Sequence, residues 1–143
     1  TGASMGVDRL LAALVKLGRT GTRRATADVL VTVVDQDLMS DCLQMAYELR
    51  RAGVHTELYL GSERGVGKQI KHADRSGIPM VALFGKDEKT KGTVTLKDLD
   101  VGKEKAASLN RTEWRELRPG QFEVARADLV RAVKEIAAAK RSR

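Results

Sequence analysis

The hydrophobic positions of this chain fall into runs of two kinds, and the first kind predicts strands. Continuous apolar runs at 29–34 and 78–84 are typical of strands that are covered on both faces. The segment 54–60 alternates instead, with Leu60 on its inner side, so we expect one of its faces to be exposed. Alternation returns at 92–97, where the outward positions are Thr93, Thr95 and Lys97.

The second kind of run has helical spacing. Apolar side chains recur every three or four residues in the segments 7–17, 38–52, 66–76 and 126–140, which are therefore predicted to be amphipathic helices. Gly53 is expected to end the second helix in a left-handed conformation. The candidate caps at the start of that helix are Asp35, Asp37 and Ser40.

The order of these segments predicts the architecture. Strand, helix, strand, helix and strand follow one another through short connections, which implies crossover helices and a parallel sheet. A polar loop over 85–91 is too short for a crossover, so 92–97 should pair antiparallel with its neighbour. The segment 99–124 is expected to hold a further strand and a helical excursion around Trp114, a packing anchor. The fold class is α/β, with a mixed, mostly parallel five-stranded sheet flanked by three helices.

A change in composition marks the domain organisation. The segment 19–26 is polar, basic and glycine-bearing, as linkers are, and it separates the helical segment 1–18 from one compact domain over 27–143. A chain of 143 residues can bury one sizeable core.

The charge balance favours a polyanionic partner. The net charge is +7, which places nucleic acid ahead of membrane, while a basic surface kept for solubility is the bland alternative. Aromatic residues make up only 3% of the chain, which argues against a protein that binds single strands mainly by stacking bases.

Cysteine and histidine are too few for several kinds of site. Cys42 is the one cysteine, so an internal disulfide is excluded, and its spacing on a predicted helix favours a buried thiol over a nucleophile. With His55 and His72 as the only histidines, a zinc site is not expected. No apolar run approaches membrane-spanning length, and no signal peptide is visible.

The segment 58–74 combines an apolar strand, a glycine-bearing loop and a helix start beside Arg64 and Lys68, which together suit an anion. A P-loop is excluded because Ser62 stands at its first glycine and Gln69 at its hydroxyl position. A dinucleotide fingerprint fails because Ile70 stands at its third glycine. The nucleotide motifs are thus absent.

Positive charge accumulates over 64–97, where eight Lys or Arg residues stand against three acids, an excess of five. On the third predicted helix the cations lie on the face away from the apolar residues. With polar neighbours that could read base edges in an unpaired loop, they fit RNA better than an acidic metabolite. The predicted RNA-binding residues are Arg64, Lys68, Gln69, Lys71, Arg75, Lys86, Asp87, Glu88, Thr93, Thr95 and Lys97.

Candidate catalytic groups are scarce. Asp35 and Asp37 at a strand end could bind a metal, but capping the next helix is the simpler role, so the metal prediction is none. No Ser/His/Asp or Cys/His set has a plausible arrangement, and a self-contained active site is not expected.

Several segments together resemble a known family. The segments 61–74 (GSERGVGKQIKHAD), 77–79 (GIP), 85–88 (GKDE) and 92–99 (GTVTLKDL) closely resemble the anticodon-binding domain of class II aminoacyl-tRNA synthetases, most specifically that of histidyl-tRNA synthetases. The segment 2–10 (GASMGVDRL) is similar to the end of motif 3 in the catalytic domain of those enzymes, which is why 1–18 is assigned to that domain.

The resemblance implies a function and partners. It implies binding of the anticodon region of tRNA-His, within a homodimeric, cytoplasmic parent enzyme that uses ATP and magnesium for aminoacylation, and it gives Arg9 the role of binding ATP phosphates there. Motifs 1 and 2 are absent from the chain, so the fragment itself is expected to be inactive. Two alternatives stay open: a synthetase-like regulatory domain that senses tRNA or mediates dimerisation without ligase activity, and a small-molecule α/β domain.

Overall fold

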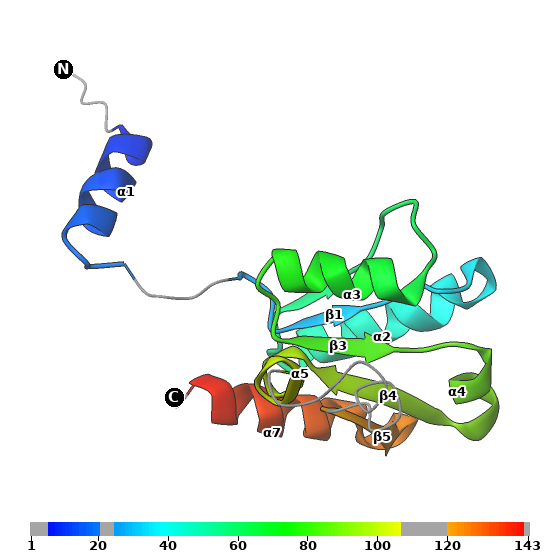
Figure 1. Cartoon of the computed structure of the whole chain (residues 1–143). Coiled ribbons are helices and arrows are strands. Elements are labelled where there is room, and N and C mark those ends of the chain that lie inside the picture. Colours follow the sequence, from blue (N-terminus) through cyan, green and yellow to red (C-terminus); the bar gives the residue numbers. More distant parts are fainter. Residues whose placement is uncertain (1–5, 21–24, 107–119, 142–143) are drawn as a thin grey trace.

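The computed structural model describes residues 6–20, 25–106 and 120–141 (Figure 1). One five-stranded sheet runs through the body of the molecule, in the order β2-β1-β3-β4-β5. Its strands are β1 (Val29–Val31), β2 (Thr56–Leu58), β3 (Met80–Leu83), β4 (Thr93–Asp98) and β5 (Gln121–Ala125). The five predicted strands are confirmed, and the fifth begins within the segment 99–124 where it was expected and ends at Ala125.

The pairing of the strands corrects one expectation. β1 pairs parallel with β2 and with β3, as predicted, and β4 pairs antiparallel with β3. β5 adds a second antiparallel pair, and the antiparallel ladders hold four and five residue pairs against three in each parallel ladder. The prediction of a mostly parallel sheet is therefore wrong, because the chain passes from β3 to β4 and from β4 to β5 without a crossover that would make them parallel.

Helices cover both faces of the sheet (Figure 1). α2 and α7 pack on the face formed by Val31, Met80 and Leu96, and α3 and α5 lie on the face formed by Leu30 and Val81. The helices of the body are α2 (Met39–Arg51), α3 (Val66–Arg75), α4 (Lys86–Lys91), α5 (Leu99–Ala106) and α7 (Leu129–Arg141), with one-turn helices η1 (Gln36–Leu38) and η2 (Arg126–Asp128) before α2 and α7. The three long predicted helices of the domain are confirmed as α2, α3 and α7.

The helix that follows β1 has the predicted inner face and end. Cys42, Met45 and Leu49 are fully buried against the sheet. Gly53 has φ 82°, the left-handed conformation expected at that position. The Asp35 side chain accepts a hydrogen bond from the Asp37 backbone N–H at 3.2 Å, so it caps η1, one turn ahead of α2.

The segment 85–91 is a helix rather than the expected polar loop. The Glu88 side chain accepts a hydrogen bond from the Gly85 backbone N–H at 2.9 Å, which supplies a cap at the start of α4. Gly92 ends the helix with φ 68°. Acids in the first turn and lysines in the last turn both favour this short helix through its dipole.

β4 lies between β3 and β5, and this position changes the exposure of its polar residues. The hydroxyl of Thr95 and the side chain of Lys97 are on the outward positions of the alternating pattern, yet the two residues are 2% and 7% exposed. The prediction that both residues are exposed is therefore wrong. It failed because alternation shows that successive side chains lie on opposite faces of a sheet, but not whether a face is covered. The opposite error occurs beyond β2, where Leu60 was assigned to the inner side and is 76% exposed.

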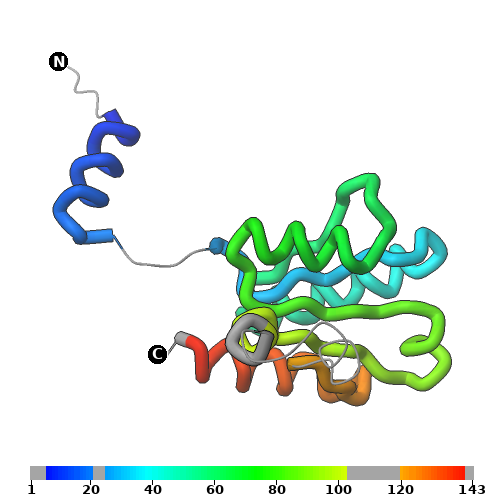
Figure 2. Tube along the Cα trace, in the orientation of Figure 1, coloured from blue at the N-terminus to red at the C-terminus, as the bar shows by residue number. Residues whose placement is uncertain are grey.

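α1 (Val7–Lys16) precedes the body and stands apart from it in the trace of Figure 2. It buries none of its residues, although its leucines form the predicted apolar side. Trp114, the expected packing anchor, lies outside the described residues.

Candidate nucleic-acid interface

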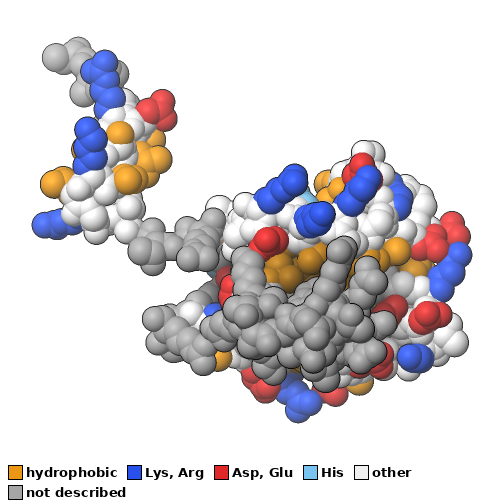
Figure 3. Space-filling view, in the orientation of Figure 1, with side chains coloured by type: hydrophobic (Ala, Val, Ile, Leu, Met, Phe, Trp, Pro, Cys, Tyr) orange, Lys and Arg blue, Asp and Glu red, His pale blue; other side chains and the backbone are white. Residues whose placement is uncertain are grey.

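The outer side of α3 carries a row of cations. Lys68, Lys71 and Arg75 are all exposed, and Figure 3 shows Lys and Arg side chains gathered along this helix. We call these three residues the α3 row. They lie on one side because residues three, four and seven positions apart return to nearly the same side of a helix. The inner side of α3 holds Gln69 and Ala73, both fully buried.

Gln69 fixes the start of α3 to the sheet. Its side-chain nitrogen donates to the Val33 carbonyl at 2.8 Å and to the Glu63 carbonyl at 3.0 Å, and its side-chain oxygen accepts from the Val33 backbone N–H at 2.9 Å. The two bonds to Val33 pair its backbone N–H and its carbonyl, which lie just beyond β1 and have no partner among the described strands. The predicted role of Gln69 as an exposed RNA contact is therefore corrected: its amide is used inside the protein.

Gly65 and Gly67 at the start of α3 are not required by the surrounding structure. A Cβ atom at either position would meet nothing within 4 Å, and neither residue has a positive φ. Gly65 is the N-cap of α3 and Gly67 lies in its first turn, and Arg64, which is exposed, directly precedes Gly65 in the chain.

The carboxyl ends of β1 and β3 form a second part of the surface. β2, the next strand in the chain, lies on one side of β1, and β3 lies on the other side. The order of the strands therefore reverses between β1 and β3, and ligands of open α/β sheets bind beside the carboxyl ends of the strands at such a point. Lys86 of α4 spans this point through ion pairs with Asp35 at 2.9 Å and Asp37 at 4.0 Å. The hydrogen bond from Lys86 lowers the pKa of Asp35, and the same bond raises the pKa of Lys86.

The structure thus divides the predicted RNA-binding residues into three groups. The exposed ones are Arg64, Lys68, Lys71, Arg75, Lys86 and Asp87. The half-buried ones are Glu88 and Thr93, and the Glu88 carboxylate is engaged by the Gly85 backbone N–H and by the Thr95 hydroxyl at 3.0 Å. The buried ones are Gln69, Thr95 and Lys97.

The expected convergence of all the cations at one sheet edge is only partly present. Lys86 lies at the carboxyl edge of the parallel strands, as predicted. Lys97 pairs in register with Val81, near the start of β3, so it lies toward the opposite edge. β4 runs antiparallel to β3, as predicted, and this direction brings the end of β4 back to that edge.

Several acids that pair with these cations were not singled out as binding residues. Glu63 pairs with Lys68, and Asp41 pairs with Lys89 at 2.9 Å. Glu63 stands five residues before its partner, so proximity in the sequence was a usable signal. Asp41 and Lys89 are 48 positions apart, and only the fold brings them together.

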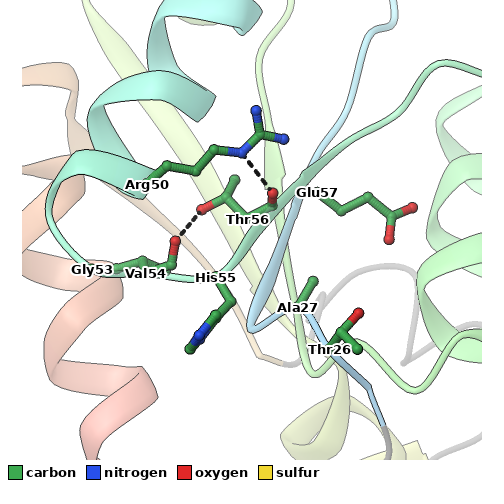
Figure 4. Close-up of a pocket in the computed structure, with 8 residues that line it drawn as sticks. All are labelled: Thr26, Ala27, Arg50, Gly53, Val54, His55, Thr56 and Glu57. Carbon is green, nitrogen blue, oxygen red and sulfur yellow. Dashed lines mark hydrogen bonds between the residues drawn. The ribbon is translucent and has the colours of Figure 1, made fainter. Parts of the chain in front are cut away.

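A hollow of about 550 Å³ lies at the amino edge of β1 and β2 (Figure 4). Its polar groups are used locally: Arg50 donates to the Thr56 carbonyl at 3.0 Å, and His55 pairs with Asp28 at 3.0 Å. In Figure 4 the side chains of His55 and Glu57 point in different directions, so they form no catalytic set.

The described residues contain no group of three His, Cys, Asp or Glu side chains that could hold a metal ion. Cys42 is buried, and its thiol donates to the Thr32 carbonyl at 3.3 Å. Burial raises the pKa of this thiol to about 11, so it is a structural group rather than a nucleophile. Within the part of the chain that the structure describes, no helix is long and apolar enough to cross a membrane.

Comparisons with known proteins agree with this geometry. A family model described as "Anticodon binding domain" matches residues 28–136. The histidine–tRNA ligase of Cereibacter sphaeroides is 51% identical over 136 residues, which is 95% of this chain and 27% of that protein, and the enzyme of Ruegeria pomeroyi is 49% identical over 138 residues, 96% of this chain and 28% of that protein. The chain thus spans a little over a quarter of the length of these curated relatives.

A solved structure gives the same result for the fold. The crystal structure of histidyl-tRNA synthetase from Nostoc sp. PCC 7120 matches with a TM-score of 0.66 and 30% sequence identity. The match covers 92% of this chain and 28% of that one.

Proposed function

The chain belongs to the anticodon binding domain family and corresponds to that domain of histidine–tRNA ligases, and on this premise we propose that it recognises the anticodon region of tRNA-His. The observation that carries the proposal is the family match over residues 28–136, which takes in the whole sheet and most of α7. In this proposal the chain supports ATP-dependent aminoacylation by a larger parent protein.

Two surfaces of the domain support RNA binding. The carboxyl edge around Lys86 offers exposed carboxylates, such as Asp37 and Asp87, beside a cation, and this mixture of donors and acceptors suits the edges of unstacked bases. The α3 row offers positive charge, which suits phosphates. We propose that the contacts to RNA come from the exposed residues of the predicted set, and that the buried residues of the set stabilise the fold.

We propose that ATP and magnesium are used by the parent protein and not by this chain alone, because motifs 1 and 2 of the family that the chain resembles do not occur in its sequence. We assign residues 1–18 to the end of a catalytic domain, 19–26 to a linker and 27–143 to the anticodon-binding domain. Arg9, exposed on α1, would bind ATP phosphates only in the intact, homodimeric, cytoplasmic enzyme.

The proposal is tested by the choice of anticodon. The chain is expected to bind a stem-loop with the tRNA-His anticodon at least about 10-fold more tightly than the same stem-loop with the anticodon bases exchanged, because one well-placed base contact contributes ~1–3 kcal/mol of discrimination. Fluorescence anisotropy at fixed salt measures both affinities.

A charge-matched competitor is the control for this measurement. Polyglutamate of the same charge as the RNA should compete only weakly at physiological salt, because it carries acids but no bases. Equal affinity for the two anticodons, or equal binding of the acidic polymer, would rule out anticodon recognition by this chain.

A further inference from the structure

The cations of α3 differ from those at the sheet edge in how they are paired. Lys71 and Arg75 form no ion pair with any residue that the structure describes, and neither does Arg64 in the loop before the helix. At the carboxyl edge the lysines are neutralised by neighbouring acids: Lys68 by Glu63, Lys86 by Asp35, and Lys89 by Asp41. Asp74 is the one acid on α3 itself.

The geometry of the row matches a nucleic-acid backbone. At 1.5 Å per residue the row from Lys68 to Arg75 is about 10 Å long, and its side chains fall within an arc of about 60°. One strand of a DNA duplex places a phosphate about every 3.4 Å along the axis, and at a spacing of this order the row spans about three successive phosphates. The row begins at Lys68, beside the carboxyl edge, and α3 then runs back toward the start of β3, so Lys71 and Arg75 lie progressively farther from the surface suited to bases.

We propose that the α3 row binds the sugar–phosphate backbone of the RNA stem next to the anticodon loop, without regard to sequence, while the carboxyl edge contacts the loop. This inference rests on the proposed function, because it assigns two parts of one RNA to two surfaces of the domain. Lys71 and Arg75 are the principal stem contacts.

The pairing of the cations determines how much each contributes. A free cation that reaches a phosphate releases a counterion from the RNA, and the affinity then falls as salt rises. Lys68 and Lys86 already hold acids, so a contact with phosphate would exchange one ion pair for another and leave the acid near the RNA. We therefore expect Lys71 and Arg75 to account for most of the salt dependence of RNA binding, although Lys68 and Lys86 are exposed cations as well.

The experiment compares single variants of the whole chain. Lys71→Ala and Arg75→Ala should each lower the slope of log affinity against log salt by about one unit, and Lys68→Ala and Lys86→Ala by clearly less. Alanine favours helix, so α3 is expected to persist in the first two variants. Circular dichroism and urea unfolding confirm that each variant is folded, and Lys71→Arg, which keeps the charge, should keep the slope.

Lys134→Ala is the matched control. Lys134 is an exposed lysine on α7, it forms no ion pair with a described residue, and it lies on the opposite face of the sheet. Its loss changes the net charge by the same amount as the loss of Lys71. The slope should be unchanged in Lys134→Ala; a loss equal to that of Lys71→Ala would mean that only the total charge matters and would overturn the inference.

Three RNA ligands separate this inference from the proposed function. Lys71→Ala and Arg75→Ala should weaken binding by the same factor for a stem-loop with the tRNA-His anticodon and for one with a scrambled loop, and should leave binding of the isolated single-stranded loop unchanged. Losses confined to the loop RNA would overturn the stem assignment while leaving the proposed function intact. If the wild-type chain does not distinguish the two stem-loops, the proposed function itself fails, whatever the variants do.

Discussion

At the scale of single residues, Gln69 illustrates how a polar side chain in a cationic segment can be structural. It is fully buried and makes three hydrogen bonds, two of them to the backbone of Val33, which lies 36 positions earlier. Without this amide, a buried N–H and a buried carbonyl beyond β1 lose their partners, and an unsatisfied buried group is destabilising.

Replacing Gln69 with Ala is expected to lower the free energy of unfolding by about 3 kcal/mol, the sum of an unsatisfied donor and acceptor and a small cavity. Urea unfolding followed by circular dichroism measures this change. Gln44→Ala is the control, since Gln44 is also a helical glutamine but is exposed and bonded only to Glu48, and its loss should change stability by less than about 0.5 kcal/mol. Similar values for the two variants would contradict the bracing role of Gln69.

At the scale of elements, side-chain contacts between distant segments hold the helices together. Arg126 of η2 forms an ion pair with Glu48 of α2 at 2.8 Å, although the residues are 78 positions apart. Lys140 of α7 likewise binds Asp98, the last residue of β4, at 2.7 Å and Asp100 of α5 at 2.6 Å. These contacts join the last helix to both sides of the sheet.

The Arg126 contact predicts a pH dependence of stability. The hydrogen bond from Arg126 lowers the pKa of Glu48 below its ordinary value of 4.5. Because the folded-state pKa is the lower one, the stabilisation is fully present above about pH 4.5 and is lost as the pH falls through the folded-state pKa. Arg126→Ala should therefore lower stability by about 1 kcal/mol at pH 7 and by much less at pH 3, as measured by urea unfolding at both pH values.

Arg131→Ala serves as the comparison for that experiment. Arg131 pairs with Asp128 three positions away, and the side chains are 71% and 51% exposed. Such an exposed local pair contributes little, so its removal should change stability by less than about 0.5 kcal/mol at either pH. A pH-independent loss in Arg126→Ala would show that packing of the arginine, and not its charge, stabilises the junction.

At the scale of the whole molecule, the structure separates a folded body from the helix that precedes it. α1 buries no residue, whereas Ala25 already packs against the cluster of Leu30 and Val81 on the sheet. The stability of the body should therefore be independent of α1.

Removal of residues 1–20 tests this independence. The melting temperature of the shortened chain, measured by calorimetry, should stay within about 2 °C of that of the whole chain, because a shift that small corresponds to less than ~0.5 kcal/mol for a domain of this size. The affinity for the anticodon stem-loop should also be unchanged. A fall of more than about 5 °C would show that α1 packs on the body in solution.

Sequence patterns determined the elements whose signals are local. Apolar runs and alternation predicted the first four strands, and helical spacing predicted α2, α3 and α7, because burial of one side of an element follows from periodicity within it. The segments 61–74 and 92–99 indicated the family through their motifs, which are also local in the sequence. The sequence alone also placed the cations of α3 on one side of their helix.

Only the tertiary structure decided which polar residues are available for binding. The burial of Gln69 depends on Val33, that of Thr95 and Lys97 on the position of β4 between β3 and β5, and the pairing of Lys86 on Asp35, none of which is close in the sequence. The mostly parallel sheet was mispredicted because strand direction depends on how each connection crosses the sheet. Exposure and pairing are properties of neighbours in space, and the chain acquires those neighbours only when it folds.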